Sequence, residues 1–154
     1  MAWSEPVANN GVARDRTEQV LGEGTLVCMW SGRGLSARNL DLDHCFPPTL
    51  SLCEDLWNLV PADREVSLWA KRMLPPSDSL LLAARGRIMS WWDAAYREPS
   101  SQNGSRLFHE ARGRLPGLIG EGEDLDALFE CVRSQGARLR RNRLALEWSC
   151  DQRI

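Results

Sequence analysis

The chain has 154 residues, which is enough for one domain with a single hydrophobic core but not for two independent ones. Hydrophobic residues make up 43% of it and charged residues 26%, as in ordinary globular proteins, and no stretch is apolar for long enough to cross a membrane. The formal net charge of −2 provides no overall attraction to nucleic acid. The first residues lack a secretion signal, so we expect a cytoplasmic protein without membrane contact.

The five cysteines include no C-x-x-C pair, which predicts free thiols and argues against a structural zinc ion. Lys71 is the single lysine, and every other basic residue is arginine. Arginine suits phosphate recognition, but a GC-rich coding bias explains this composition as well. In either case the lone lysine is a candidate functional residue.

Polar residues 1–12 predict a loose arm, and residues 14–21 a short helix that ends at glycines. Residues 25–30 form a β-prone run, and turn residues separate it from a second run at 40–46. We therefore predict that these two runs pair as a hairpin. Pro47 and Pro48 follow, which cannot continue a ladder and so place His44 near the end of its strand.

Residues 48–55 read as a loop, and residues 56–60 as a short apolar run that contains Asn58. A helix is predicted to open at residues 61–63 and to run to about residue 73. Its apolar positions recur at helical spacing, and a polar stripe with i, i+4, i+8 spacing lies on another face. The stripe consists of Asp63, Ser67 and Lys71.

The second half of the chain is predicted to be helical. Ser77 or Asp78 caps a long helix that ends near Tyr96, a third helix covers residues 106–115, and the last begins near Asp124. The sequence thus predicts an α+β fold with a two-stranded hairpin in a mainly helical single domain. Its parts are an N-terminal arm and short helix (1–24), a core (25–76) and a helical extension (77–154).

The chemistry of the predicted core centres on Asp43 and His44, an acid and an imidazole side by side at a strand end. A histidine with its ordinary pKa of about 6.5 can act as a base at neutral pH. A hard divalent cation such as Mg²⁺ takes oxygen ligands, and one carboxylate together with phosphate oxygens is a common set. These groups fit the hydrolysis of a phosphodiester bond.

Two segments, Asp43-His44-Cys45-Phe46-Pro47 and residues 55–63, followed by Lys71-Arg72, resemble the bacterial HNH endonuclease family. The resemblance covers roughly residues 25–76. It implies the ββα-metal fold, in which a hairpin and a helix enclose one divalent ion, Mg²⁺ or alternatively Mn²⁺. It also implies that Asp43 is a metal ligand, His44 the general base, Asn58 the residue that pins the loop and orients the site, and Lys71 a phosphate contact.

The third motif position departs from the family pattern, because Ser67 stands where Asn or His is expected as a second metal ligand. A neutral hydroxyl is a weak ligand, and Asp63, one turn earlier, is the predicted substitute. The Arg-rich last helix predicts contacts to a nucleic-acid backbone, although cations also simply favour a helix C-terminus. The predicted nucleic-acid contacts are Lys71, Arg72, Arg138, Arg140, Arg141 and Arg143.

The leading hypothesis is a metal-dependent endonuclease that acts on DNA, with RNA as the alternative substrate. A targeting partner protein or a homodimer, and a role in phage defence, follow from family analogy alone. The rival hypothesis is a catalytically impaired module that binds nucleic acid or a partner protein without cleaving. His109, far from the motif in sequence, is predicted to be a surface residue.

Overall fold

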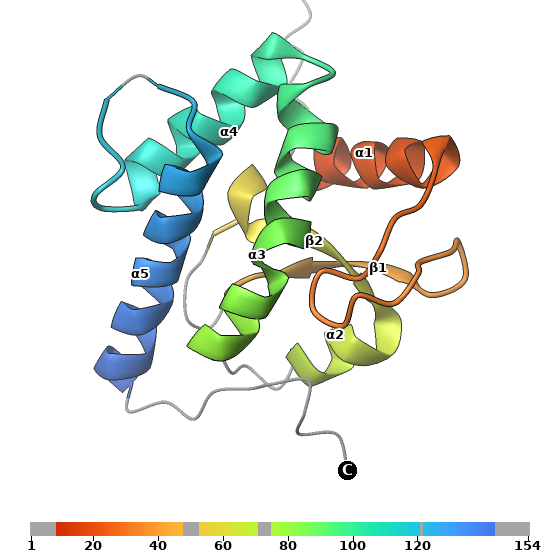
Figure 1. The fold of residues 1–154 in the computed structure, drawn as a ribbon, viewed down its shortest axis with the longest axis horizontal. Coiled ribbons are helices and arrows are strands. Elements are labelled where there is room, and N and C mark those ends of the chain that lie inside the picture. Colours follow the sequence, from red (N-terminus) through yellow and green to blue (C-terminus); the bar gives the residue numbers. More distant parts are fainter. Residues whose placement is uncertain (1–8, 48–52, 71–74, 121, 144–154) are drawn as a thin grey trace, which may run out of the picture.

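The chain has a mostly helical α+β fold with a two-stranded antiparallel hairpin, as predicted (Figure 1). The computed structural model describes residues 9–47, 53–70, 75–120 and 122–143. Hydrophobic side chains from the hairpin and from the helices around it form one continuous core within these residues. None of the described helices combines the length and the apolar composition needed to cross a bilayer.

The hairpin pairs strand β1 (Leu40–His44) with strand β2 (Leu59–Asp63). His44 lies opposite Leu59 at one end of the ladder, and Leu40 lies opposite Asp63 at the other. A 3₁₀ turn, η1 (Leu56–Asn58), leads into β2, and helix α2 (Arg64–Ala70) follows β2 directly. Helix α2 also packs against β1. The two strands and the helix that follows them thus form one packed unit.

The predicted hairpin partner was wrong. Residues 25–30 form a tight loop and not a strand, with one isolated bridge between Val27 and Gly34. Gly32 turns the chain with φ of 75°, a conformation that glycine adopts without strain. The loop attaches to the edge of β2 through a 3.1 Å hydrogen bond from Met29 N to Pro61 O.

The predicted start of the second helix was also wrong, because residues 61–63 belong to β2 and the helix begins at Arg64. Pro61 reads as a helix start in the sequence, but both strands of a two-stranded sheet are edges, where proline is tolerated. Asp63 ends the strand, and its Oδ1 accepts a 2.9 Å hydrogen bond from Glu65 N in the first turn of α2. Asp63 therefore precedes the helix, and the predicted helical stripe does not include it.

Helix α1 (Asn9–Glu23) begins earlier than predicted, inside the segment expected to be a loose arm. It packs against β2 and against η2, a π-helical turn (Asp93–Arg97). Arg16 Nε of α1 donates to Ala95 O in that turn at 2.7 Å. Residues 1–8 of the predicted arm lie outside the described residues.

Helix α3 (Asp78–Trp92) confirms its prediction. The Ser77 side chain accepts a 3.1 Å hydrogen bond from Leu80 N and caps the helix, as the sequence indicated. The chain then continues through η2, so that the helical run ends close to the predicted Tyr96. Helix α3 crosses the hairpin (Figure 1), and Trp91 Nε1 donates to Leu59 O of β2 at 3.3 Å.

Helices α4 (Ser101–Arg114) and α5 (Leu125–Arg143) complete the fold. Helix α4 starts before the predicted residue 106, because the Ser100 side chain accepts from Asn103 N at 3.2 Å and caps it there. Helix α5 lies beside α3 (Figure 1) and approaches it closely at Gly136. A Cβ at Gly136 would lie 3.3 Å from a ring carbon of Phe46, so glycine lets α5 pack next to the end of β1.

Candidate functional site

The structure brings Asp43, His44 and Asn58 together at one end of the hairpin. Asp43 and His44 are the last two residues of β1, and His44 lies opposite Leu59, the residue after Asn58. Directly beyond β1, Cys45 N donates to Asn58 O at 2.8 Å. Three residues separated by up to fifteen positions in the sequence thus lie at one corner of the fold.

Asn58 pins the loop next to this corner. Its side chain is fully buried, and its Oδ1 accepts from Phe46 N at 2.9 Å. Its Nδ2 donates to Phe46 O at 3.3 Å and to Cys53 O at 2.8 Å. These bonds tie the chain that leaves β1 to the chain that returns towards β2, so Asn58 lies where the resemblance put a loop-pinning residue.

We expect Asn58→Ala to lower the free energy of unfolding by about 3–5 kcal/mol, because it leaves buried amide and carbonyl groups of Phe46 and Cys53 unpaired. Denaturant unfolding monitored by circular dichroism measures this loss. Asn103→Ala on α4 is the control and should change the same quantity by less than about 0.5 kcal/mol. Equal effects of the two substitutions would contradict the pinning role.

Asp43 carries a buried carboxylate at the end of β1. The residue is 6% exposed, and its Oδ1 accepts from His44 N at 2.8 Å. Its Oδ2 is buried and has no hydrogen-bond partner among the described residues. Burial raises the pKa of Asp43 from 3.8 to about 6, although the bond from His44 N, the His44 charge and the Trp30 indole partly offset it.

Ser67, on α2, is the second buried oxygen of this kind. The residue is fully buried, and within the described part of the chain its Oγ has no hydrogen-bond partner. Helix α2 packs against β1, the strand that carries Asp43. Buried polar atoms are paired in the great majority of cases, so these two oxygens, like Trp92 Nε1 and Tyr96 Oη among the described residues, are places where a water molecule can bind.

His44 has a carboxylate partner that the sequence did not predict. Its Nε2 lies 2.8 Å from Glu54 Oε1, and the two side chains are 21% and 59% exposed. Glu54 falls in the stretch that the sequence analysis assigned to a loop without a role. The sequence feature that could have indicated this contact is an acidic residue four positions before Asn58.

Asp63 lies at the opposite end of the hairpin, which removes it from the candidate metal site. Its partner Leu40 is three residues from Asp43 along β1, a separation of about 10 Å at about 3.3 Å per residue. Both carboxylate oxygens are also engaged: Oδ2 accepts from Asn39 Nδ2 at 2.9 Å and Oδ1 from Glu65 N. Among the described residues, no three His, Cys, Asp or Glu side chains form a cluster that could hold a metal ion.

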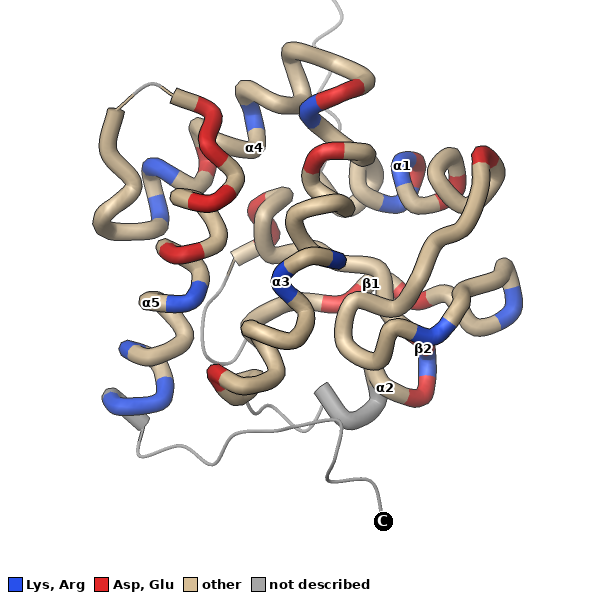
Figure 2. The backbone as a smooth tube through the Cα atoms, in the orientation of Figure 1, with Lys and Arg blue, Asp and Glu red and all other residues tan. Residues whose placement is uncertain are grey.

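The predicted basic residues fall into two groups. Lys71 and Arg72 lie outside the described residues, as does the side chain of Arg143. The others lie in the C-terminal half of α5, where basic positions gather and acidic ones are confined to the start of the helix (Figure 2). Arg140 Nη1 donates to Pro76 O at 2.8 Å and so ties α5 to the turn before α3, whereas Arg141 is exposed.

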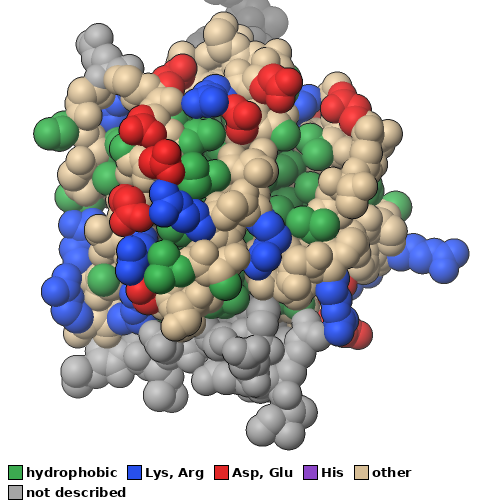
Figure 3. Space-filling view, viewed as in Figure 1, with side chains coloured by type: hydrophobic (Ala, Val, Ile, Leu, Met, Phe, Trp, Pro, Cys, Tyr) green, Lys and Arg blue, Asp and Glu red, His purple; other side chains and the backbone are tan. Residues whose placement is uncertain are grey.

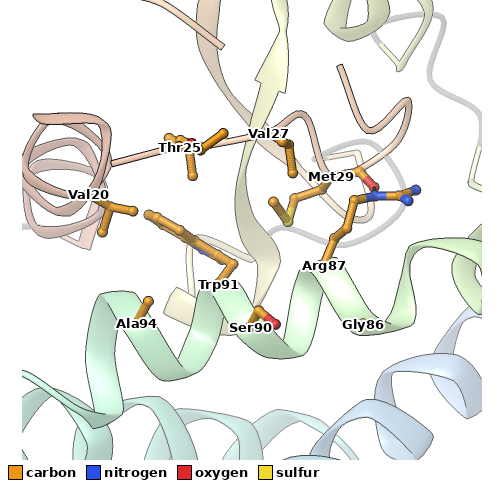
Figure 4. A pocket seen from close by; sticks show the side chains of 10 residues that line it. Val20, Thr25, Val27, Met29, Gly86, Arg87, Ser90, Trp91 and Ala94 are labelled. Atoms are coloured by element: carbon orange, nitrogen blue, oxygen red, sulfur yellow. Dashed lines mark hydrogen bonds between the residues drawn. The ribbon is translucent and has the colours of Figure 1, made fainter. Parts of the chain in front are cut away.

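A separate hollow of about 320 Å³ lies between α1, α3 and the loop of residues 25–30 (Figure 3). Its lining is mostly apolar, with Trp91 of α3 pointing towards Val20 of α1 (Figure 4). Arg87 donates to Met29 O at 2.8 Å and to Trp30 O at 3.2 Å. Arg87 therefore holds the loop whose Trp30 reaches Asp43, but the hollow itself contains none of the predicted site residues.

Comparisons with protein-family models, with curated proteins and with solved structures found no match to this chain. The remaining sequence predictions concern side chains outside the site. His109 is exposed on α4, as predicted. The four described cysteines, Cys28, Cys45, Cys53 and Cys131, are free thiols.

Proposed function

We propose that this protein is a metal-dependent endonuclease of the HNH type that hydrolyses phosphodiester bonds in DNA, with RNA as the alternative substrate. The observation that carries the proposal is the convergence of Asp43, His44 and Asn58 at the end of a hairpin that runs directly into α2. The resemblance implied a hairpin followed by a helix, with Asp43, His44 and Asn58 at one site, but it placed the other strand at residues 25–30 and not at Leu59–Asp63. The unpaired buried oxygen of Asp43 supports the proposal independently.

The oxygens at this corner fit a hard divalent cation, Mg²⁺ or alternatively Mn²⁺. Asp43 Oδ2 is anionic when deprotonated, buried and unpaired among the described residues, and Ser67 Oγ lies on the helix packed against the same strand. Mg²⁺ keeps several of its water molecules, so one or two protein oxygens are sufficient to hold it beside a phosphate. When bound, such a cation polarises the phosphate and neutralises charge on the leaving oxygen.

The other residues have roles that their positions support. His44, half-buried at the end of β1, accepts a proton from the attacking water. Asn58 holds the loop that follows β1 in place and so orients the site. Arg138 and Arg141, in the last turns of α5, contribute salt-dependent contacts to the nucleic-acid backbone. The resemblance adds Lys71 and Arg72, which lie outside the described residues.

The experiment that tests the proposal is a plasmid-nicking assay with the wild-type protein and His44→Ala. The supercoiled plasmid is incubated with Mg²⁺ or Mn²⁺, or with a chelator. Cleavage that depends on both the metal and His44 supports the endonuclease. If the wild type cleaves no faster than His44→Ala, the proposal fails.

The second candidate is a module of the same fold that binds nucleic acid or a partner protein without cleaving. The observation that favours it is the small number of charged metal ligands: Ser67 is neutral, and Asp63 lies at the other end of the hairpin. This candidate predicts a gel shift with duplex DNA that does not change on addition of metal or in the His44→Ala variant. A binding protein would thus shift the DNA without nicking it, whereas the nuclease would nick it in a way that depends on the metal and on His44.

Substitution of Ser67 tests whether its hydroxyl group contributes to the proposed metal site. Ser67→Ala removes a buried hydroxyl that has no partner in the described part of the chain, so we expect stability to stay within about 1 kcal/mol of the wild type. The Mn²⁺ concentration needed for half-maximal nicking should nevertheless rise by about threefold to tenfold if Oγ contacts the cation or its water shell. Ser67→Asn, which restores a ligand of the family type, should lower that concentration and raise the rate. An unchanged metal dependence in both variants would mean that Ser67 is only a small core residue.

A further inference from the structure

Glu54 lies where a carboxylate can control the imidazole of His44. The 2.8 Å distance from Glu54 Oε1 to His44 Nε2 is that of a good hydrogen bond. No property of the sequence motif required an acid at this position, because the motif residues are Asp43, His44 and Asn58. The contact exists because residues 53–55, which precede η1, lie against the end of β1.

The backbone around Glu54 is held on both sides, although the Glu54 side chain is 59% exposed. Glu54 O accepts from Asn9 Nδ2 of α1 at 3.1 Å. On one side Cys53 O accepts from Asn58 Nδ2 at 2.8 Å, and on the other Leu56 N donates to Glu110 Oε1 of α4 at 3.0 Å. Three separate elements thus fix the short segment from which the carboxylate reaches His44.

The chemistry of the two groups determines which ring nitrogen carries the proton. An ionised carboxylate only accepts hydrogen bonds, so a bond to Glu54 requires the proton on His44 Nε2. In the neutral ring the lone pair is then on Nδ1, which is left as the proton acceptor. A general base needs this kind of orientation, since a ring that rotates or changes tautomer presents the wrong nitrogen to water.

We propose that Glu54 is a positioning residue, which holds the His44 ring with Nε2–H donated to its carboxylate and with Nδ1 free to accept a proton. This inference rests on the proposed endonuclease function. In the reaction, Nδ1 takes a proton from water as the water oxygen forms a bond to phosphorus. The bond from phosphorus to the leaving oxygen breaks, that oxygen takes a proton from solvent, and His44 returns its extra proton to solvent.

The experiment compares Glu54→Ala and Glu54→Gln with the wild type, and uses Glu18→Ala on the exposed face of α1 as the control for loss of one carboxylate. Long-range ¹H–¹⁵N spectra of the histidine rings, recorded at about pH 8.5 where an ordinary imidazole is neutral, report the tautomer. We expect one tautomer and a protected Nε2–H signal for His44 in the wild type. Glu54→Ala should give a mixture of tautomers and lose that signal through exchange with water.

The nicking assay tests the consequence of this orientation. Glu54→Ala should lower kcat by about tenfold with little change in KM, a smaller loss than removal of the base itself because the carboxylate is half-exposed. Glu54→Gln keeps an oxygen that can accept the bond, so it should retain more activity than Glu54→Ala. A purely structural role would not produce this order together with the ring signal.

The two proposals fail in different ways. If Glu54→Ala matches Glu18→Ala in both kcat and the ring spectrum, the positioning role is overturned while the endonuclease stands. A changed ring spectrum with an unchanged kcat overturns it as well. If the wild type does not nick DNA at all, the endonuclease proposal fails, and the ring spectra of wild type and Glu54→Ala alone decide whether Glu54 fixes the imidazole.

Discussion

His44→Ala is expected to lower the rate of metal-dependent plasmid nicking by about 10²–10⁴-fold, because it removes the group that accepts the proton of the attacking water. His44 is the one histidine at the end of the hairpin, and within the described residues its ring contacts a single carboxylate. Removal of a half-buried side chain at a strand end should cost the fold little, so the loss is chemical. The assay follows conversion of supercoiled to open-circular plasmid over time.

The chain offers a matched control, since His109 is its other histidine and lies exposed on α4. His109→Ala should nick at the wild-type rate, and both variants should give the wild-type circular dichroism spectrum. Loss of activity in His109→Ala alone would place the base elsewhere. Equal activity of His44→Ala and the wild type would rule out His44 as the base.

In the absence of metal, the free energy of unfolding of Asp43→Asn should increase relative to that of the wild type as the pH rises. Below about pH 3 the carboxyl of Asp43 is mostly neutral in both the folded and the unfolded chain, so its burial carries almost no charge penalty. As the pH rises from about 4 to about 6, the unfolded chain ionises first, and the wild type loses stability. The difference between 3.8 and about 6 corresponds to about 3 kcal/mol, which is then constant above about pH 6.

Denaturant unfolding in a chelator, at about pH 4 and about pH 7.5, measures this effect. Any cost of burying the amide is the same at both pH values and cancels, so the variant should gain up to about 3 kcal/mol relative to the wild type between them. Asp15→Asn, on the exposed side of α1, is the control and should show no such gain. A pH-independent difference for Asp43→Asn would contradict the raised pKa.

Addition of Mn²⁺ at neutral pH should offset most of the stability that Asp43→Asn gains over the wild type. A cation bound at Asp43 stabilises the folded wild type through mass action, by about 2.7 kcal/mol when its concentration is 100 times the dissociation constant. Asp43→Asn lacks the anionic oxygen and should gain little. This measurement detects the metal site even in a protein that does not cleave DNA, and an equal gain in both proteins would place the metal elsewhere.

The corner that holds Asp43, His44 and Asn58 could be predicted because its signals are local. Alternation along residues 40–44 indicated a strand, Pro47 and Pro48 marked its end, and Asn58 stood out as a polar residue in an apolar run. The capped start of α3 at Ser77 was predicted for the same reason. Each of these features depends on a few neighbouring residues.

The errors arose where distant residues decide the structure. Residues 25–30 have the composition of a strand, but β1 pairs instead with Leu59–Asp63, in which Pro61 suggests the start of a helix. In the register of that pairing, Asp63 lies at the end of the hairpin opposite to Asp43. The bond from Glu54 to His44 depends on the same return of the chain and left no recognisable pattern in the sequence.

The sequence by itself determined the α+β class, the end of β1 and the residue types that bring an acid, an imidazole and an amide to that end. Tertiary structure alone decided which strand completes the hairpin, which oxygens remain buried and unpaired, and which carboxylate reaches His44. The physical reason is that strand ends and caps follow from side chains a few residues apart, whereas pairing, burial and desolvation depend on contacts between segments far apart in the chain. Local sequence therefore identifies His44, the proposed base, whereas the packing of α2 on β1 decides whether Ser67 can join Asp43 in the proposed metal site.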